Sequence, residues 1–202
     1  MKNGKMINLS DYPIFKNNWD TLKETSKDKR DKYQITYMTE LEIHVINFDK
    51  VKTEYLNGLG KSEEAAKSVD AIGATDGPDG HITLIEFKNG KVEPRDVKTK
   101  IKDSLLIILD KCNKTISFSR ENFDFILVYN EDPKTGDNIA KVEDDHSKRY
   151  IRQHVFRKAG EFEIKFGLGL YEGVYVRKIY TLTKDEFHNF LLKTPLIDLK
   201  FS

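Results

Sequence analysis

The chain has 202 residues, of which 38% are apolar, so it can build one sizeable hydrophobic core and gives no reason to expect two. Its 34 basic and 33 acidic side chains leave a net charge of +1, which excludes a general electrostatic attraction to nucleic acid and requires any basic surface to be local. Cys112 has no partner for an intrachain disulfide, and no apolar run is long enough to span a bilayer. We therefore expect a cytoplasmic protein that does not enter a membrane.

The first part of the chain differs in composition from the rest. Residues 1–33 are polar and rich in lysine, and we expect a partly ordered leader there, followed by a single α/β domain at residues 34–202. Apolar residues alternate over residues 35–45, which favours an extended segment. Residues 39–48 could also form a helix, and the pattern leaves both interpretations open.

A first helix is expected next. Asn47 or Asp49 can cap its amino end, and Phe48 and the apolar residues that follow recur at helical spacing up to about Leu56. The stretch Asn57-Gly58-Leu59-Gly60 should end it, because glycine adopts the backbone conformation found at helix carboxyl ends.

The centre of the chain reads as a hairpin and a crossover. Two apolar runs, 69–74 and 81–88, flank a turn rich in glycine and aspartate, and they predict two antiparallel strands. Pro94 can open a helix whose apolar stripe ends near Ile108, and the apolar run 123–129 predicts a further strand. The order strand, helix, strand predicts parallel pairing of the last two strands.

The last part of the chain should alternate helices and strands. We expect a helix over 147–158, strands over 162–166 and 174–181, and a final helix opened by the capping-box spacing of Thr183 and Glu186.

Three charged residues should converge in the hairpin. Glu86 and Lys88 are two positions apart on one strand and therefore share a face, and Asp70 lies on the preceding strand. Two carboxylates among apolar neighbours are unfavourable unless a divalent cation and a phosphate complete the charge balance. The alternative is an ordinary ion pair between Glu86 and Lys88 with Asp70 exposed to solvent.

Asp70 is followed sixteen positions later by Glu86-Phe87-Lys88, and the predicted order of elements is helix, hairpin, crossover helix and strand. In these features the chain resembles, over roughly residues 47–130, the PD-(D/E)xK superfamily of restriction-endonuclease-like nucleases. The resemblance implies a mixed central sheet flanked by helices. It also implies that Asp70 and Glu86 hold Mg²⁺ or Mn²⁺, that the Phe87 carbonyl adds a ligand, and that Lys88 orients the attacking water or stabilises developing charge. The chain departs from the family pattern at Val69, where many members have proline.

The same resemblance suggests further site residues. Family members often add a glutamate from the first helix, and Glu54 is the preferred candidate here, ahead of Glu42 and Glu63. They also often place a lysine or glutamine on the crossover helix, which favours Lys100 or Lys98. Both lysines could equally belong to a solvated helix face.

Nucleic-acid contact is expected on the helix at 147–158, which carries five basic residues and no acidic one. Helical projection places Lys148, Arg149 and Arg152 within one arc, so these three are the predicted phosphate contacts. Surface solubility would explain the same residues.

The leading hypothesis is a Mg²⁺-dependent endonuclease that acts on DNA in preference to RNA, and the resemblance suggests a setting in mobile elements or phage defence. The competing hypothesis is a catalytically silent copy of the same fold that binds a protein partner, for example as an immunity or anti-defence factor. A homodimer that cleaves both strands is a third hypothesis.

Overall fold

The computed structural model describes residues 7–28, 35–75, 80–130 and 163–199. Among these residues, six strands form one sheet in the order β1-β4-β5-β6-β7-β8, and two short strands pair separately. The main sheet contains β1 (Trp19–Thr21), β4 (His44–Asn47), β5 (Ala71–Ala74), β6 (Ile82–Lys88), β7 (Phe123–Tyr129) and β8 (Lys178–Thr183), and the small sheet contains β2 (Lys27–Asp28) and β3 (Thr36–Tyr37). The α-helices are α1 (Pro13–Lys16), α2 (Leu22–Thr25), α3 (Phe48–Gly58), α4 (Pro94–Lys111), α5 (Ile116–Asn122) and α7 (Lys184–Lys193), and the 3-10 helices are η1 (Leu9–Asp11), η2 (Glu63–Ala65) and η3 (Gly169–Tyr171).

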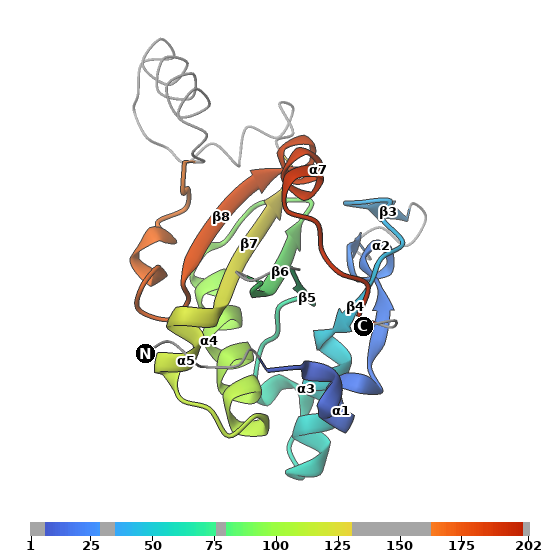
Figure 1. Cartoon of the computed structure of the whole chain (residues 1–202), viewed down its shortest axis with the longest axis vertical. Coiled ribbons are helices and arrows are strands. Elements are labelled where there is room, and N and C mark those ends of the chain that lie inside the picture. Colours follow the sequence, from blue (N-terminus) through green and yellow to red (C-terminus); the bar gives the residue numbers. More distant parts are fainter. Residues whose placement is uncertain (1–6, 29–34, 76–79, 131–162, 200–202) are drawn as a thin grey trace.

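The main sheet is mixed, as expected. From β1 to β6 all neighbouring strands are antiparallel, whereas β6–β7 and β7–β8 are parallel pairs that lie side by side in Figure 1. The predicted hairpin is confirmed by the pairing of β5 with β6, and the predicted crossover by α4, which connects β6 to the parallel β7. The coarse prediction of a mixed sheet flanked by helices is therefore confirmed.

Helices bury both faces of the sheet, as parallel strands require. On one face α4 packs against the strands and α3, and this core cluster includes Val97, Ile101, Leu105, Ile108, Val51, Leu84 and Phe125. On the other face α7 covers the strands, and this cluster includes Phe187, Leu191, Ile85, Phe87 and Ile126. Because strand side chains alternate, the two clusters divide β6 and β7 between them.

Local capping signals were read correctly from the sequence. The Asn47 side chain accepts a hydrogen bond from the backbone N–H of Lys50 (3.2 Å), so Asn47 and not Asp49 caps α3. The capping box at the start of α7 forms between Thr183 and Glu186. Residues 39–43 do not form a helix, so the extended interpretation of this segment was the correct one.

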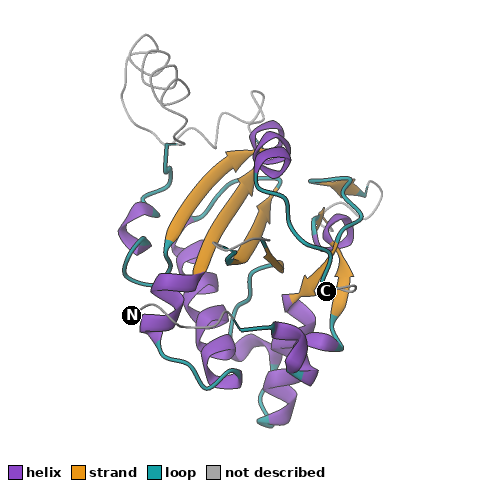
Figure 2. Cartoon of the chain, viewed as in Figure 1, coloured by secondary structure: helices purple, strands orange, loops and turns teal. Residues whose placement is uncertain are grey.

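The predicted boundary at residue 33 is not supported by the described part of the leader. β1 pairs with β4 as an edge strand of the main sheet, and Figure 2 shows short helices around this edge. Phe15 and Leu22 have no exposed surface and join the two core clusters. Residues 7–28 therefore belong to the same folded unit as the rest.

Of the two strands predicted near the carboxyl end, the first is wrong in its described residues and the second is confirmed only from residue 178 onward. Residues 163–165 form no strand, because the Thr181 hydroxyl donates to the Glu163 carbonyl (2.9 Å) and accepts from the Lys165 N–H (2.9 Å) in place of a backbone ladder. Phe166 has a positive φ of 59°, which turns the chain away. β8 begins at Lys178 and not at residue 174, because the Gly173 N–H bonds the Val176 carbonyl in a turn.

The predicted helix at 147–158 lies outside the described residues, as does residue 162 of the first of these strands. Within the ranges that the structure describes, no helix is both long enough and apolar enough to cross a membrane.

Candidate functional site

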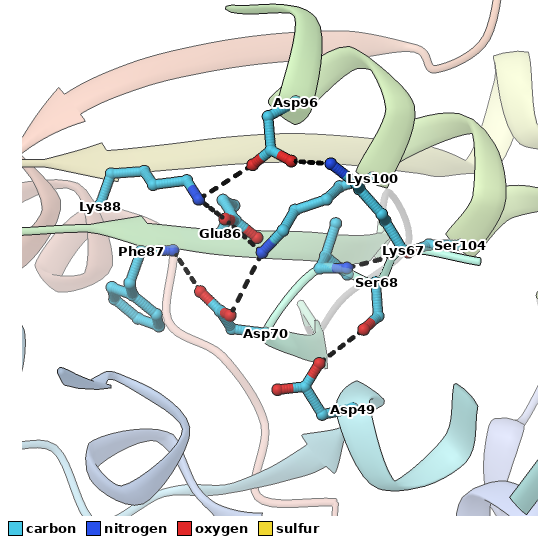
Figure 3. A network of polar contacts seen from close by, with 11 residues as sticks. Asp49, Lys67, Ser68, Asp70, Glu86, Phe87, Lys88, Asp96, Lys100 and Ser104 are labelled. Carbon is cyan, nitrogen blue, oxygen red and sulfur yellow. Dashed lines mark hydrogen bonds and ion pairs between the residues drawn. The ribbon is translucent and has the colours of Figure 1, made fainter. Parts of the chain in front are cut away.

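The hairpin register brings Asp70 beside Glu86. Ala71 pairs with Ile85, and the Asp70 N–H donates to the Ile85 carbonyl (3.1 Å), so Asp70 stands one residue before β5 but continues its ladder. Glu86 and Lys88 point from the same face of β6 toward α4, as their alternation predicts (Figure 3). This face also receives Lys100 from α4.

Two lysines converge on one oxygen of Glu86. The Lys100 Nζ atom lies 2.7 Å from Glu86 Oε1 and 3.9 Å from Asp70 Oδ1. The Lys88 Nζ atom lies 3.0 Å from the same Glu86 Oε1 and 3.2 Å from Asp96 Oδ2. The predicted convergence of Asp70, Glu86, Lys88 and Lys100 is thus present, and an isolated Glu86–Lys88 ion pair is not.

The second oxygen of Glu86 has no partner. Glu86 is fully buried, and its Oε2 atom has no hydrogen-bond partner among the described residues. The neighbouring Asp70 accepts a hydrogen bond from the Phe87 N–H through Oδ2 (2.6 Å). A buried carboxylate oxygen without a partner is unfavourable and calls for an explanation.

The pKa values of Asp70, Glu86 and Lys100 are shifted by burial and by the charges that these groups place on one another. Burial, with the charge of Glu86 added to it, raises the pKa of Asp70 well above its usual range, and the Lys100 ammonium opposes the rise only in part. Burial also raises the pKa of Glu86 against the pull of Lys100 and Lys88. For Lys100 burial favours the neutral amine, but the two carboxylates prevail and raise its pKa. Burial is therefore the main reason that both carboxyl groups hold protons more tightly than usual, although two lysines lie beside them.

The chain before Asp70 is anchored by side chains on two helices. The Ser104 hydroxyl on α4 accepts a hydrogen bond from the Val69 N–H (3.0 Å), and the Ser68 hydroxyl donates to Asp49 at the start of α3 (2.5 Å). These contacts fix the backbone that presents Asp70 to the site (Figure 3).

Asp96 and Asp49 are site neighbours that sequence reasoning missed. Asp96 accepts from Lys88 and from Lys67, whose Nζ atom lies 2.6 Å away, and so holds Lys88 toward Glu86. It precedes Lys100 by one helical turn, and this spacing could have revealed it. Asp49 could have been found from its place in the first turn of the predicted helix.

Glu54 does not join the site. It accepts a hydrogen bond from the Asn18 side chain (2.7 Å) and lines a different surface pocket from Asp70. Glu54 lies five positions after Asp49 and lines the same pocket as Asp49, and neither residue lines the pocket that contains Asp70 and Glu86. The prediction of Glu54 as a metal ligand is therefore corrected.

The remaining candidate residues also lie away from the site. Glu42 pairs with Lys23 (3.5 Å), and Glu63 is exposed in η2. Lys98 lies over the ring of Tyr171, 5.7 Å from its centroid, which leaves Lys100 as the lysine that α4 supplies to the site. The predicted nucleic-acid contacts Lys148, Arg149 and Arg152 are outside the described residues.

The donor set suits a hard divalent cation. Mg²⁺ needs only one or two carboxylates, because waters and substrate phosphate complete its coordination. Asp70 and Glu86 supply two carboxylates, one with an unpartnered oxygen, and the Lys100 ammonium already lies as a cation between them. Among the described residues there is no cluster of three or more His, Cys, Asp or Glu side chains placed to hold a metal ion.

None of the family models, curated proteins or solved structures compared with the chain matches it. What the site does must therefore be argued from its own geometry.

Proposed function

We propose that this protein is a metal-dependent nuclease that hydrolyses phosphodiester bonds with Mg²⁺ or Mn²⁺. The observation that carries the proposal is the unpartnered, buried Oε2 atom of Glu86 beside the carboxylate of Asp70. The order of hairpin, Glu-x-Lys strand, crossover helix and parallel strand supports assignment to the restriction-endonuclease-like fold.

Asp70 and Glu86 would hold the cation, with the Phe87 carbonyl as a further donor. A bound Mg²⁺ lowers the pKa of a coordinated water and neutralises charge on the phosphate. Lys88 is held by Asp96 and Glu86 with its ammonium beside the carboxylates, where it can stabilise negative charge that develops on the phosphate. Lys100 offsets part of the negative charge of the carboxylate pair and keeps the pair compact before substrate arrives.

We infer DNA in preference to RNA as the substrate, and a setting in mobile elements or phage defence, from the resemblance to the superfamily. Both inferences depend on hydrolysis being demonstrated first.

A second candidate is a silent copy of the fold that binds a protein partner. The specific observation in its favour is that Lys88 and Lys100 both pair with Glu86 Oε1, so the two lysines could balance the two carboxylates without a metal. Such a scaffold would bind neither Mg²⁺ nor Mn²⁺ and would cleave nothing.

The deciding experiment compares the purified protein with Asp70→Asn, Glu86→Gln and Lys88→Ala in Mg²⁺-dependent cleavage of labelled DNA. We expect each substitution to lower the rate by about 100-fold or more, the scale on which removal of one group that stabilises charge acts. Asp103→Asn is the matched control, because Asp103 lies on α4 but accepts its hydrogen bond from the Lys67 backbone N–H (2.9 Å). Retained cleavage in Asp70→Asn would contradict the proposal.

A further inference from the structure

Asp70, Glu86, Lys88 and Lys100 line a pocket of about 320 Å³. One side is formed by the end of β6 and the residues that follow it, and the opposite side by the turn from α2 into β2 together with Met38. The lining of these two sides comprises residues 86–91 on the first and Thr25, Ser26, Lys27, Asp28 and Met38 on the second.

The far wall is anchored within the fold. The buried Ser26 hydroxyl accepts hydrogen bonds from the backbone N–H groups of Met38 and Thr39 (both 3.2 Å). Met38 is itself buried in the core cluster beneath α7. Lys184 of α7 donates to the Tyr37 carbonyl (3.1 Å), which fixes the wall from the other side.

The two walls are also tied to each other. The Asn89 side chain, directly after β6, donates to Asp28 Oδ2 on the far wall (2.8 Å). The Asn130 side chain donates in turn to Asn89 Oδ1 (3.0 Å). This bridge links residues 61 positions apart in the sequence, and both of them line the pocket that contains Lys88 and Glu86.

The reacting groups are recessed as a result. Glu86 has no exposed side-chain surface, and Asp70, Lys88 and Lys100 expose only 19%, 22% and 18% of theirs. A duplex is a stiff rod with its phosphates fixed along the outer surface, so a recessed group is harder to reach for a duplex phosphate than for a phosphate of a flexible strand. A single strand bends and can thread one phosphodiester between the walls.

Charges at the rim fit a strand that enters there. Lys27 and Lys91 line the pocket, and their acidic partners Glu24 (3.8 Å) and Glu93 (2.8 Å) are solvent-exposed. The Lys91–Glu93 pair is exposed and therefore weak, whereas the Lys27 side chain is 26% exposed and also lies over the Tyr37 ring. Both ammonium groups add positive charge to the pocket lining, which favours a bound phosphate backbone.

We propose that the pocket selects single-stranded DNA or unpaired DNA ends over duplex DNA. This inference rests on the proposed nuclease function, and it adds that the wall of residues 25–28 and Met38 determines the substrate class.

The test is cleavage of one labelled DNA strand, alone and as a blunt duplex with its complement, in the presence of Mg²⁺. The single strand should be cut faster by about tenfold or more, because a stiff duplex presents its phosphates less easily to a recessed site. Equal or faster cutting of the duplex overturns the inference and leaves the nuclease proposal standing. Absence of cutting on either substrate, with Mg²⁺ or Mn²⁺, overturns the nuclease proposal and this inference with it.

A substitution in the pocket wall tests whether the wall affects substrate choice independently of the proposed catalytic residues. Asp28→Ala removes the bridge to Asn89, so the ratio of single-strand to duplex cutting should fall at least threefold, on the order of the effect of one lost hydrogen bond. Glu172→Ala is the matched control, because this carboxylate also accepts one hydrogen bond, from the Ile179 N–H (2.9 Å), but does not line the pocket. An unchanged ratio in Asp28→Ala, or an equal fall in Glu172→Ala, would show that the wall does not select the substrate.

Discussion

The sheet buries carboxylates in two places, and only one of them is balanced. Asp124, at the start of β7, receives two hydrogen bonds from Arg177, at 3.0 and 2.6 Å, so each of its oxygens has a partner. Asp70 and Glu86, at the other end of the neighbouring strand, face each other, and one Glu86 oxygen has none. Burial raises the pKa of the carboxyl group in both places, so a raised pKa does not by itself mark a functional site.

The two sites differ in the groups that pair with their carboxylate oxygens. A bidentate arginine supplies a hydrogen-bond donor to each Asp124 oxygen, so this carboxylate is paired within the fold. In the Asp70–Glu86 site two carboxylates lie together, and one Glu86 oxygen lacks a hydrogen-bond partner among the described residues, which leaves a donor atom for a cation. We interpret the first as structural and the second as a cation site.

The largest change in the free energy of unfolding is expected when the Asp124–Arg177 pair is broken. Asp124→Asn would leave the Arg177 guanidinium without its counter-charge and should lower the free energy of unfolding by about 2–3 kcal/mol, since breaking a buried pair exposes the remaining charge to an apolar setting. Urea unfolding near neutral pH measures it. A change as small as that of the control Asp103→Asn would refute the structural role of the pair.

In the candidate site, removal of a carboxylate should instead raise the free energy of unfolding. Because the folded state raises the pKa of Asp70, the wild type loses stability as pH rises from the usual carboxyl range through the raised value. Asp70→Asn removes this loss and keeps an acceptor for the Phe87 N–H. Without metal the variant should match the wild type near pH 4 and exceed it by about 1 kcal/mol at pH 8 or so.

Thermal unfolding of both proteins across this pH range provides the check. If Asp70→Asn were less stable than the wild type at the upper end, Asp70 would be a stabilising partner like Asp124, and the contrast between the two sites would be lost.

The smallest change in the free energy of unfolding is expected for Lys67, at the edge of the polar network around Asp70 and Glu86. Lys67 pairs with Asp96 at 2.6 Å, but 53% of its side chain is exposed. Lys67→Ala should therefore change the free energy of unfolding by less than about 0.5 kcal/mol, as for most exposed ion pairs. A loss several times larger, measured by urea unfolding, would mean that the whole network is structural.

The sequence was sufficient to predict the core of the candidate site. Strand alternation forces Glu86 and Lys88 onto one face, and the hairpin brings Asp70 to them, so these relations follow from local rules. The helix that carries Lys100 follows from its apolar stripe. The choice of Lys100 over Lys98 needed the structure, because both lie near the edge of that stripe.

Other parts depend on contacts between distant segments. The pocket wall forms because Asp28 meets Asn89 and Ser26 meets Met38, and neither pairing has a sequence signal. For the same reason the sequence predicts a partly ordered leader before residue 33, although β1 is an edge strand of the main sheet. Glu54 was misplaced because the apolar positions of the helix show which face packs on the sheet but not which side of the helix approaches Asp70.

The most direct test of the central claim is a calorimetric titration of Mg²⁺, repeated with Mn²⁺, into the wild type and Asp70→Asn near neutral pH. The account predicts that the wild type binds the cation and releases protons, with tighter binding as pH rises, because metal and proton compete for the same carboxylates. Asp70→Asn should lose this binding while remaining folded. Absence of binding to the wild type, or equal binding to both proteins, would contradict the claim that the unbalanced carboxylate pair is a metal site.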